Sequence, residues 1–547
     1  MSEFQQNPGD RSSLPEMPIG KNLIGGRWRA SGDLTFKAFS PVEDASLTPT
    51  FTEATNAEID ESVGVAAAAF LESRKLKKET RIQLLEGIAS LLEARSEVLL
   101  ERCMLETGYE LGRAKGELVR TINQTRGFAS MLREGSWVDA RINLAEPNRR
   151  PLPKPDVRSM LQPLGPVAVV GASNFPFAIS VAGADTCTAL AAGCSVIVKS
   201  HHGHPGTCEL VAEVIREVIN DLDLPAGLFA LLHGQSERVG QRLVSHPKLA
   251  ALAFTGSEAG GRAFSRMAAE RDCPIPVFAE LGSVNPVVVS KVAANQRSDE
   301  IADGFLQSLL LGGGQFCTNP GLLLVPANDD GDRLIERFRT ALEKAPIAVL
   351  LHRGISENYR QRVQQREGRT EGNEETHHFA QSMATSDLRC AAVPAVEIVN
   401  GADCSSECFE EIFGPFSTIV RWQCTEEILD VLGHLPGQLT TTLHADDDEL
   451  EEWAAVVDQL QLKSGRFLMN GFPTGVEPCD SMHHGGPFPA ASLPHFTSIG
   501  NAAIKRFVRP MCYQDLPESW LPEELRNANP HGIMRMVDGL YTDIALE

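Results

Sequence analysis

Apolar residues recur at three- and four-residue spacing near the start of the chain. The pattern runs from Asn56 to about Arg133 and is clearest in "NAEIDESVGVAAAAFLESR" and "TRIQLLEGIASLLEARSEVLLERCMLETG". This spacing is typical of amphipathic helices, which bury one face against a core. We therefore expect a helical region over 56–133. Residues 1–20 show no such pattern and are expected to form a loose tail.

Short apolar runs alternate with helical patterns in the middle of the chain. Strands are indicated by "GPVAVVG", "CSVIVKS", "GLFALLHG" and "LAALAFTGS". Strands that alternate with helices predict a parallel, doubly wound sheet. A second α/β stretch follows from about 285 to 480, and the end of the chain is extended and loop-like. The prolines of "NRRPLPKPDVRSML" (148–161) predict a linker or an exposed ribbon.

Composition narrows the class of protein. The chain has 547 residues, 42% apolar and 22% charged, which is ordinary for a soluble globular protein. Its net charge of −22 disfavours nucleic acid or an anionic membrane as a partner. The chain has no run of about 18 apolar residues, so no membrane-spanning helix is predicted. Its first residues contain no apolar segment typical of a secretion signal, so we expect a cytoplasmic protein. The twelve cysteines are then expected to be reduced thiols.

Two glycine-containing turns follow predicted strands and are candidates for binding a nucleotide. The turn "GASNFPFA" (171–178) lacks the G-x-G-x-x-G fingerprint and by itself indicates a plain turn. In "FTGSEAGG" (254–261), Gly256 and Ser257 open a predicted helix whose backbone N–H groups can bind a pyrophosphate. Lys199 ends a strand between these two turns. Together these features predict a nucleotide site.

A lone cysteine follows three glycines in "LGGGQFCTNPG" (311–321). Glycine adopts backbone angles closed to other residues and lets a ligand approach closely. Cys317 is therefore either a small buried apolar residue, as free cysteines usually are, or a nucleophile that faces a pocket.

Six motifs occur in the order and at the spacings of the aldehyde dehydrogenase superfamily: "GASNFPF", "VIVKSHH", "AFTGS", "AELGSVNP", "GGGQFCTNPG" and "EEIFGP". The chain resembles this superfamily from about Asn22 to about Pro510. Within it, the chain looks most like the branch of 2,5-dioxopentanoate (α-ketoglutaric semialdehyde) dehydrogenases and bacterial NADP-dependent fatty aldehyde dehydrogenases.

The resemblance implies an α/β fold of three parts. A Rossmann-like cofactor domain would comprise residues 21–140 and 160–281, and an α/β catalytic domain residues 282–490. A small β segment, residues 141–159 and 491–547, would mediate oligomerisation. In this family such segments pair across subunits, so a homodimer or homotetramer is expected.

The resemblance also implies catalytic roles. Cys317 matches the nucleophile, which forms a thiohemiacetal and then a thioester. The side-chain amide of Asn174 and the backbone N–H of Cys317 match the donors to the oxyanion. Glu280 matches the general base that activates water, and burial in "PVFAELG" is expected to raise its pKa. The acyl-CoA-forming branch lacks this base, so Glu280 favours release of a free acid.

The expected cofactor is NADP, with NAD possible. Lys199 matches the contact to the adenosine ribose, Glu411 the carboxylate that holds the nicotinamide ribose, and Phe413 the adjacent ring. NAD-specific relatives usually carry glutamate where this chain has His202, and NADP-using relatives place an arginine at Arg238. An arginine pairs with a 2′-phosphate, whereas a glutamate repels it.

Histidine pairs and "CSSEC" (404–408) lack the ligand spacing of known zinc sites, so no metal is expected. His484 in "HHGGP" is a separate case. It matches a histidine near the active site of the NADP-dependent fatty aldehyde branch. A structural role is the favoured interpretation, and a proton relay is the alternative.

The segment "PFPAASLPHFTSIG" departs from the dioxopentanoate branch. Leu493 to Phe496 stand where relatives carry polar residues and an arginine. If that arginine holds a substrate carboxylate, this chain lacks it. Three hypotheses follow: NADP-dependent oxidation of 2,5-dioxopentanoate to 2-oxoglutarate; oxidation of a fatty or other apolar aldehyde; or a non-catalytic descendant of the fold.

Overall fold

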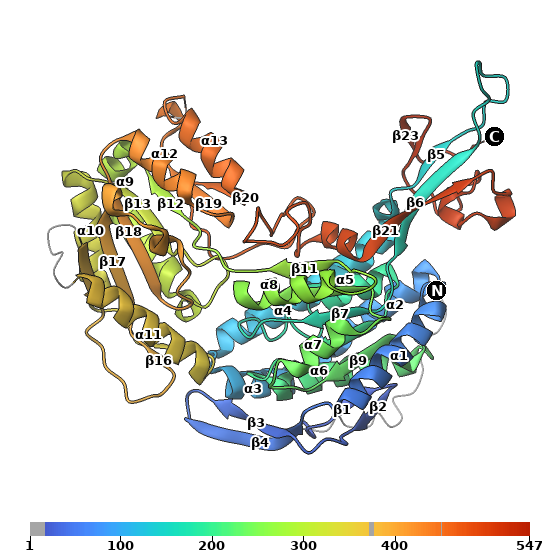
Figure 1. The fold of residues 1–547 in the computed structure, drawn as a ribbon, viewed down its shortest axis with the longest axis horizontal. Coiled ribbons are helices and arrows are strands. Elements are labelled where there is room, and N and C mark those ends of the chain that lie inside the picture. The colour runs from blue at the N-terminus through green and yellow to red at the C-terminus, as the bar shows by residue number, and fades with distance from the viewer. Residues whose placement is uncertain (1–16, 371–376, 450, 547) are drawn as a thin grey trace, which may run out of the picture.

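The computed structural model describes residues 17–370, 377–449 and 451–546, so residues 1–16 of the expected tail lie outside it. Two seven-stranded sheets form the body of the molecule, and a five-stranded sheet projects from it (Figure 1). Small two-stranded sheets, β3–β4 and β14–β16, flank them. The expected α/β architecture is confirmed.

The first sheet has the strand order β11-β10-β7-β8-β9-β1-β2. Strands β7 to β11 are parallel, and β1 and β2 add an antiparallel edge. The bounds are β1 Asn22–Ile24, β2 Arg27–Arg29, β7 Val167–Val170, β8 Val196–Lys199, β9 Phe229–Leu232, β10 Ala251–Thr255 and β11 Val277–Glu280. The nearby hairpin consists of β3 Thr35–Ser40 and β4 Ala45–Thr52.

Helices cover both faces of this sheet, which explains why its strands are apolar at every position. Along β7, Val167 and Val169 belong to one apolar core, and Ala168 and Val170 belong to the other. Helices α1 to α4 account for the helical pattern over 56–133, which is confirmed. The bounds are α1 Asn56–Ser73, α2 Lys78–Ala94, α3 Ser96–Thr107, α4 Leu111–Glu134, α5 Ala184–Ala192, α6 Pro205–Asp221, α7 Arg238–Ser245 and α8 Glu258–Ala269.

The second sheet has the order β15-β17-β18-β13-β12-β19-β20, parallel except for β15. It confirms the second α/β stretch. Its strands are β12 Val287–Val289, β13 Leu322–Pro326, β15 His377–Gln381, β17 Ala395–Asn400, β18 Phe416–Trp422, β19 Gln438–His444 and β20 Ser464–Met469. Its helices are α9 Lys291–Leu310, α10 Asp329–Leu342, α11 Arg353–Thr370, α12 Thr425–His434 and α13 Ala454–Lys463. The short strands β14 Ala348–Val349 and β16 Ala391–Ala392 pair beside it.

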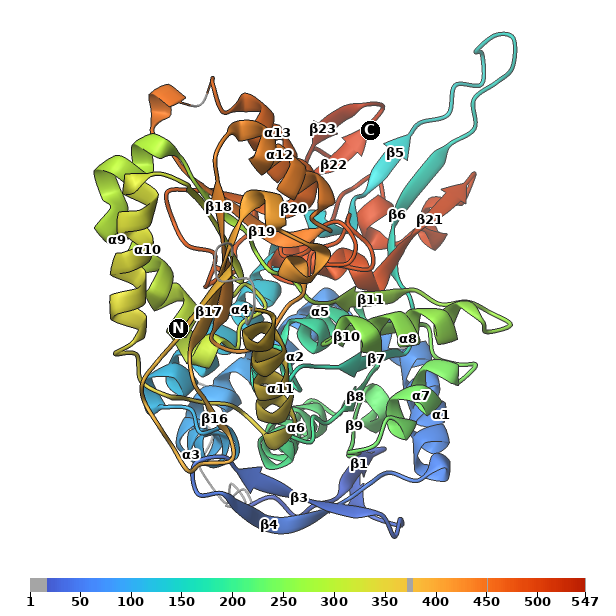
Figure 2. The ribbon, with the colours of Figure 1, turned by 60° about the vertical axis from the view of Figure 1, so that its left-hand side comes forward.

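The third sheet joins segments far apart in the sequence, in the order β21-β6-β5-β22-β23. The proline-bearing stretch 148–161 leads from β5 into β6, and both views show this ribbon extending away from the body (Figures 1 and 2). The bounds are β5 Arg141–Asn143, β6 Val157–Pro163, β21 Val508–Gln514, β22 Arg535–Val537 and β23 Leu540–Thr542.

One segment differs from the expected division of the chain. The sequence groups 491–547 together, but Ala491 forms an isolated bridge with Glu280, and the 3-10 helix Asn501–Phe507 packs against α5. Only the part from Val508 onward joins the third sheet. Residues 491–507 therefore lie against the first sheet's unit. The other domain boundaries stay a prediction.

Candidate active site

A cavity of about 670 Å³ lies where the strand order of the first sheet reverses, beyond the ends of β7, β8 and β10. Ligands of doubly wound sheets bind at such a switch point. Residues from the second sheet's unit close the other side, so the cavity lies between the two units. Most residues singled out in the sequence line it: Asn174, Lys199, His202, Gly256, Ser257, Glu280, Cys317, Glu411 and Phe413.

The glycine run before Cys317 forms a tight turn after α9. Gly312, Gly313 and Gly314 all have positive φ, at 57°, 69° and 69°. A Cβ on Gly314 would lie 2.3 Å from the Gly414 carbonyl, so backbone meets backbone here. Only glycine fits this geometry without strain. The turn presents Cys317, partly exposed, to the cavity.

Cys317 is joined to Glu280 through His484. The Cys317 Sγ lies 3.4 Å from His484 Nε2, and His484 Nδ1 lies 2.6 Å from Glu280 Oε1. Ser498 Oγ donates to the same Oε1 at 2.5 Å, and no described residue donates to Glu280 Oε2. The histidine that sequence analysis favoured as structural therefore contacts both the thiol and the carboxylate.

The Glu280–His484 pair is ionic. Burial disfavours the charged form of each group, but the mutual attraction and their hydrogen bond outweigh it. The pKa of His484 is raised to about 10, and the pKa of Glu280 is lowered. The expectation that burial raises the pKa of Glu280 is therefore wrong. A buried cation, absent from the local sequence around Glu280, reverses the direction.

Asn174 is anchored to the nucleophile's loop. Its side-chain Nδ2 donates to Gln315 O at 3.0 Å, two residues before Cys317. Its backbone carbonyl accepts from Tyr109 Oη at 2.8 Å and from Arg113 Nη2 at 3.0 Å. These contacts from α3–α4 fix the Asn174 turn against the Cys317 turn. An amide held at this position can donate its other hydrogen toward the nucleophile.

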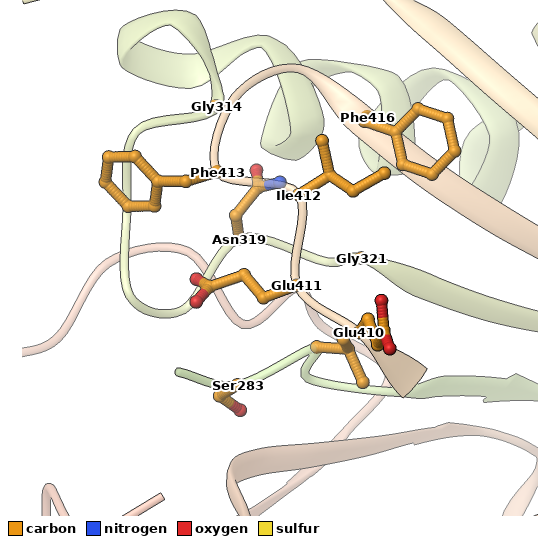
Figure 3. A pocket seen from close by; sticks show the side chains of 10 residues that line it. Ser283, Gly314, Asn319, Gly321, Glu410, Glu411, Ile412, Phe413 and Phe416 are labelled. Carbon is orange, nitrogen blue, oxygen red and sulfur yellow. The ribbon is translucent and has the colours of Figure 1, made fainter. Parts of the chain in front are cut away.

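Glu411 approaches the cavity from the loop before β18. Figure 3 shows Glu411 and Phe413 on one side of this loop and Ile412 and Phe416 on the other. A Cβ on Gly282 would lie 2.6 Å from Glu411 Oε2, so the glycine makes room for this carboxyl. Burial raises the pKa of Glu411 to about 8. It is therefore largely protonated at neutral pH, able to donate as well as accept a hydrogen bond.

Lys199 and His202 line the same cavity. Burial lowers the pKa of Lys199 to about 8, and the ammonium donates to Gly234 O at 2.9 Å. Burial, with help from His352 and Lys199, lowers the pKa of His202 to about 3, so its ring is neutral. No group of three or more His, Cys, Asp or Glu side chains within the described ranges could hold a metal ion.

The structure does not support a phosphate-binding role for Arg238. Its guanidinium is paired with Glu53 at 2.9 Å and donates to Asn56 and to the Ala54 carbonyl. It does not line the cavity, whereas its neighbours Ser236 and Glu237 do. Glu53 lies far away in the sequence, so nothing near Arg238 indicated this competing partner.

Sequence reasoning missed several residues that complete the site. Ser498 binds Glu280, Gln315 binds Asn174, and Asn285 Nδ2 donates to the Cys317 carbonyl at 2.9 Å. The signal for Asn285 was its place in "GSVNP". Ser498 and Gln315 carried no chemical signal, because a hydroxyl and an amide are common everywhere.

The fold and this site define a dehydrogenase of an NAD(P)-using class, with Cys317 as the candidate nucleophile. The chain belongs to the aldehyde dehydrogenase family, whose sequence model matches residues 28–487. It is 45% identical to alpha-ketoglutaric semialdehyde dehydrogenase 2 of Azospirillum brasilense, over 95% of this chain and 99% of that protein. It is 40% identical to alpha-ketoglutaric semialdehyde dehydrogenase of Acinetobacter baylyi, over 96% and 99%.

Solved structures share the fold at lower identity. An NADP-dependent glyceraldehyde-3-phosphate dehydrogenase from Bacillus halodurans, complexed with NADP, superposes with a TM-score of 0.76 at 20% identity, over 90% of this chain and 98% of that one. A Thermus 1-pyrroline-5-carboxylate dehydrogenase with bound NAD gives 0.74 at 22%, over 90% and 92%. No helix in the described part of the chain could span a membrane.

Proposed function

We propose that this protein oxidises 2,5-dioxopentanoate to 2-oxoglutarate, with NADP as the hydride acceptor and water as the source of the second oxygen. The observation that carries the chemistry is the Cys317–His484–Glu280 line at the edge of a dinucleotide-sized cavity. The substrate is proposed because two relatives at 45% and 40% identity bear the name alpha-ketoglutaric semialdehyde dehydrogenase.

The first step is addition of Cys317 Sγ to the aldehyde carbon. His484, held as an imidazolium by Glu280, donates its Nε2–H to the sulfur, which attacks as the thiolate after the thiol proton has left to solvent. The Asn174 amide and the Cys317 N–H then hold the oxyanion, and loss of such a donor typically costs about 3 kcal/mol in the barrier. The product of this step is a thiohemiacetal on Cys317.

The residues of the cavity fit a dinucleotide. Gly256 and the N-cap Ser257 directly precede α8, where N–H groups and the helix dipole favour a phosphate. Lys199 and Glu411 supply a cation and a carboxyl at separate places in the same cavity. When bound, the oxidised nicotinamide would accept the hydride and leave a thioester on Cys317.

The last step is hydrolysis of that thioester. Water adds to the acyl carbon, and its proton passes to the Glu280–His484 pair. Glu280 Oε2 can accept from this water because Oε1 already takes both hydrogen bonds. The C–S bond then breaks, and His484 can donate to the departing sulfur. In sum, aldehyde, NADP⁺ and water yield carboxylate, NADPH and two protons.

The apolar-aldehyde alternative rested on the segment Leu493–Phe496. Leu493 and Phe496 pack on the core beneath the first sheet, and Phe496 meets Phe278 edge-on at 5.2 Å. They do not line the cavities that reach Cys317. The altered segment therefore gives no support to an apolar substrate pocket, which favours the semialdehyde.

NADP is proposed over NAD because His202 stands where a glutamate would repel a 2′-phosphate, with Lys199 nearby.

We also propose a homodimer or homotetramer formed through the third sheet. Its edge strand β21 and the hairpin β22–β23 leave Met511, Leu540 and Tyr541 exposed. The cytoplasm is the proposed location.

The test is NADPH appearance by absorbance with a panel of aldehydes, with NADP and NAD in parallel. We expect a higher kcat/KM for 2,5-dioxopentanoate than for hexanal, and no turnover by C317A. A preference for hexanal would favour the fatty aldehyde alternative. NADP binding without turnover of any aldehyde would favour the non-catalytic descendant.

A further inference from the structure

A second cavity reaches Cys317 separately from the dinucleotide cavity. Its lining includes Phe175, Phe316, Cys317, His484 and Arg120. The two phenylalanines meet edge-on at 5.4 Å, and Phe316 directly precedes Cys317 in the sequence. The cavity is small, about 20 Å³, and both His484 and Cys317 line it, so it is a candidate approach for an aldehyde.

Arg120 lines this inner cavity and also an outer one. The outer cavity, about 480 Å³, is lined by residues of α4 and of the loop around Glu477. Arg120 lines both, and its Cζ lies 5.8 Å from the centre of the Phe175 ring. The guanidinium is therefore common to the cavity at Cys317 and the larger outer cavity.

Arg120 has no hydrogen bond or ion pair with any described residue, and its Nε is buried without a partner. Burial lowers the pKa of Arg120, and the nearby Cys317, Glu117 and Glu477 oppose this without forming an ion pair to it. A partly desolvated guanidinium without a partner is costly unless an anion completes it.

Two other arginines near Cys317, Arg113 and Arg466, already donate hydrogen bonds to loops of the site. Arg113 donates to Tyr109 and to the Asn174 carbonyl. Arg466 donates to the carbonyls of Gly475 and Pro473. Both position loops of the site. Arg120 differs from both because it makes no hydrogen bond to any described residue.

Gln124 lies one helical turn after Arg120, on the same face of α4. It lines the outer cavity and a third cavity that also contains Arg120 and Glu280. Its side chain is 8% exposed, and its Nε2 is buried without a partner. The unpartnered donors of Arg120 and Gln124 thus lie on one face of α4, and both residues line the outer cavity.

We propose that Arg120 and Gln124 bind the 2-oxo acid end of the substrate and so determine specificity. Arg120 pairs with the carboxylate, and the Gln124 amide donates to the 2-oxo oxygen. This rests on the proposed function. It assigns to α4 the recognition of the substrate carboxylate, in place of the arginine that the segment before Thr497 lacks.

The test compares 2,5-dioxopentanoate, 5-oxopentanoate and pentanal, which have equal chain length. The first has the carboxylate and the 2-oxo group, the second only the carboxylate, and the third neither. We expect R120Q to raise KM for both acids about 10- to 100-fold, with kcat and the pentanal reaction little changed. For R120K we expect KM values between those of wild type and R120Q, because lysine keeps the positive charge but lacks the two parallel N–H donors of a guanidinium.

Q124L tests the second contact. We expect it to raise KM about 2- to 10-fold for 2,5-dioxopentanoate and to leave 5-oxopentanoate unchanged. The matched control is R126Q, on the same helix, because Arg126 is exposed and paired with Glu93 away from these cavities. Ratios between substrates within one variant are unaffected by any fraction that fails to fold.

Two failures are distinguishable. A wild-type enzyme that prefers pentanal to 2,5-dioxopentanoate overturns the proposed substrate. A wild-type enzyme that prefers 2,5-dioxopentanoate, with the same preference kept in R120Q, overturns the assignment of Arg120 alone. An equal effect of Q124L on both acids overturns the assignment of the 2-oxo contact.

Discussion

Cys317, His484 and Glu280 contact one another in that order, and the charge of His484 affects the two groups on either side of it. His484 is held as a cation by Glu280, and the same cation keeps Glu280 ionised despite its burial. At neutral pH the carboxylate is thus ready to accept a proton. The pair persists until the pH falls through the lowered pKa of Glu280 or rises through about 10.

Replacing His484 removes the charge that keeps Glu280 ionised. In H484Q, burial is left to raise the pKa of Glu280, so the carboxyl takes up a proton at higher pH and loses its function as a base. We expect kcat to fall about 100-fold or more and its acid limb to move to higher pH. The measurement is kcat against pH from 5 to 9.

The control for this experiment is H483Q. His483 is adjacent and half-buried but makes no hydrogen bond to Cys317 or Glu280 in the described structure. It should keep the wild-type profile. A wild-type profile in H484Q itself would assign His484 the structural role.

Two positions, His202 and Arg238, test the choice between NADP and NAD. In H202E, a carboxylate beside Lys199 would repel a 2′-phosphate and bind ribose hydroxyls instead. We expect the ratio of kcat/KM for NADP to that for NAD to fall about 10-fold or more. R238Q should leave the ratio unchanged, because Glu53 already holds this guanidinium. A large loss of NADP preference in R238Q would mean that the pair opens on binding.

At the scale of elements, the turn between α9 and β13 determines where the nucleophile lies. In G314A, a Cβ would meet the Gly414 carbonyl at 2.3 Å, and φ is positive, so the turn must shift. A displacement of about 1 Å can cost 100-fold in rate, so we expect a loss of at least that order in kcat. Activity and NADP binding are measured together.

The matched control is G112A, where nothing lies within 4 Å of the new Cβ and the position is within helix α4. Alanine should keep activity there and stabilise the helix slightly. Normal kcat in G314A would show that the turn can reposition Cys317 without the close approach.

At the scale of the whole molecule, stability of the cofactor-free protein depends on pH through Glu411. Its pKa is raised from 4.5 to about 8 in the folded state, so the folded protein binds a proton more tightly than the unfolded chain. Stability therefore falls as pH rises between these values. In E411Q this penalty is absent. We expect its apparent Tm to gain about 1–3 °C on wild type between pH 5 and 9.

Scanning fluorimetry of both proteins without cofactor provides the measurement. A constant difference in Tm across this range would show that Glu411 ionises normally in the folded protein. Activity of E411Q is measured separately, since Glu411 is also proposed to contact the nicotinamide ribose.

The oligomeric state is also a property of the whole molecule. We expect light scattering to give a mass that is a multiple of 59.4 kDa. A charge at an exposed apolar position of the third sheet, in L540E with Y541E, should lower the mass if this sheet forms the interface. E300Q, at an exposed position of α9 in the second sheet's unit, is the control, and an unchanged mass in the double variant would place the interface elsewhere.

Much of the fold could be predicted because its signals are local. The helices α1 to α4 followed from apolar spacing, and the strands β7 to β10 of the first sheet followed from short apolar runs that are buried on two faces. For the second sheet only an α/β stretch from about 285 to 480 was predicted. The glycine run Gly312–Gly314 also predicted a tight turn, since positive φ and close backbone contact both require glycine.

The sequence by itself determined the α/β alternation, the nucleotide turns and the residue types of the site, because these depend on neighbours along the chain. Only the tertiary structure decided what those residues do. It put His484 between Cys317 and Glu280, gave Arg238 to Glu53, and left Arg120 without a partner. The physical reason is that charge and hydrogen bonding depend on distance in space. The partners here come from segments up to about two hundred residues apart.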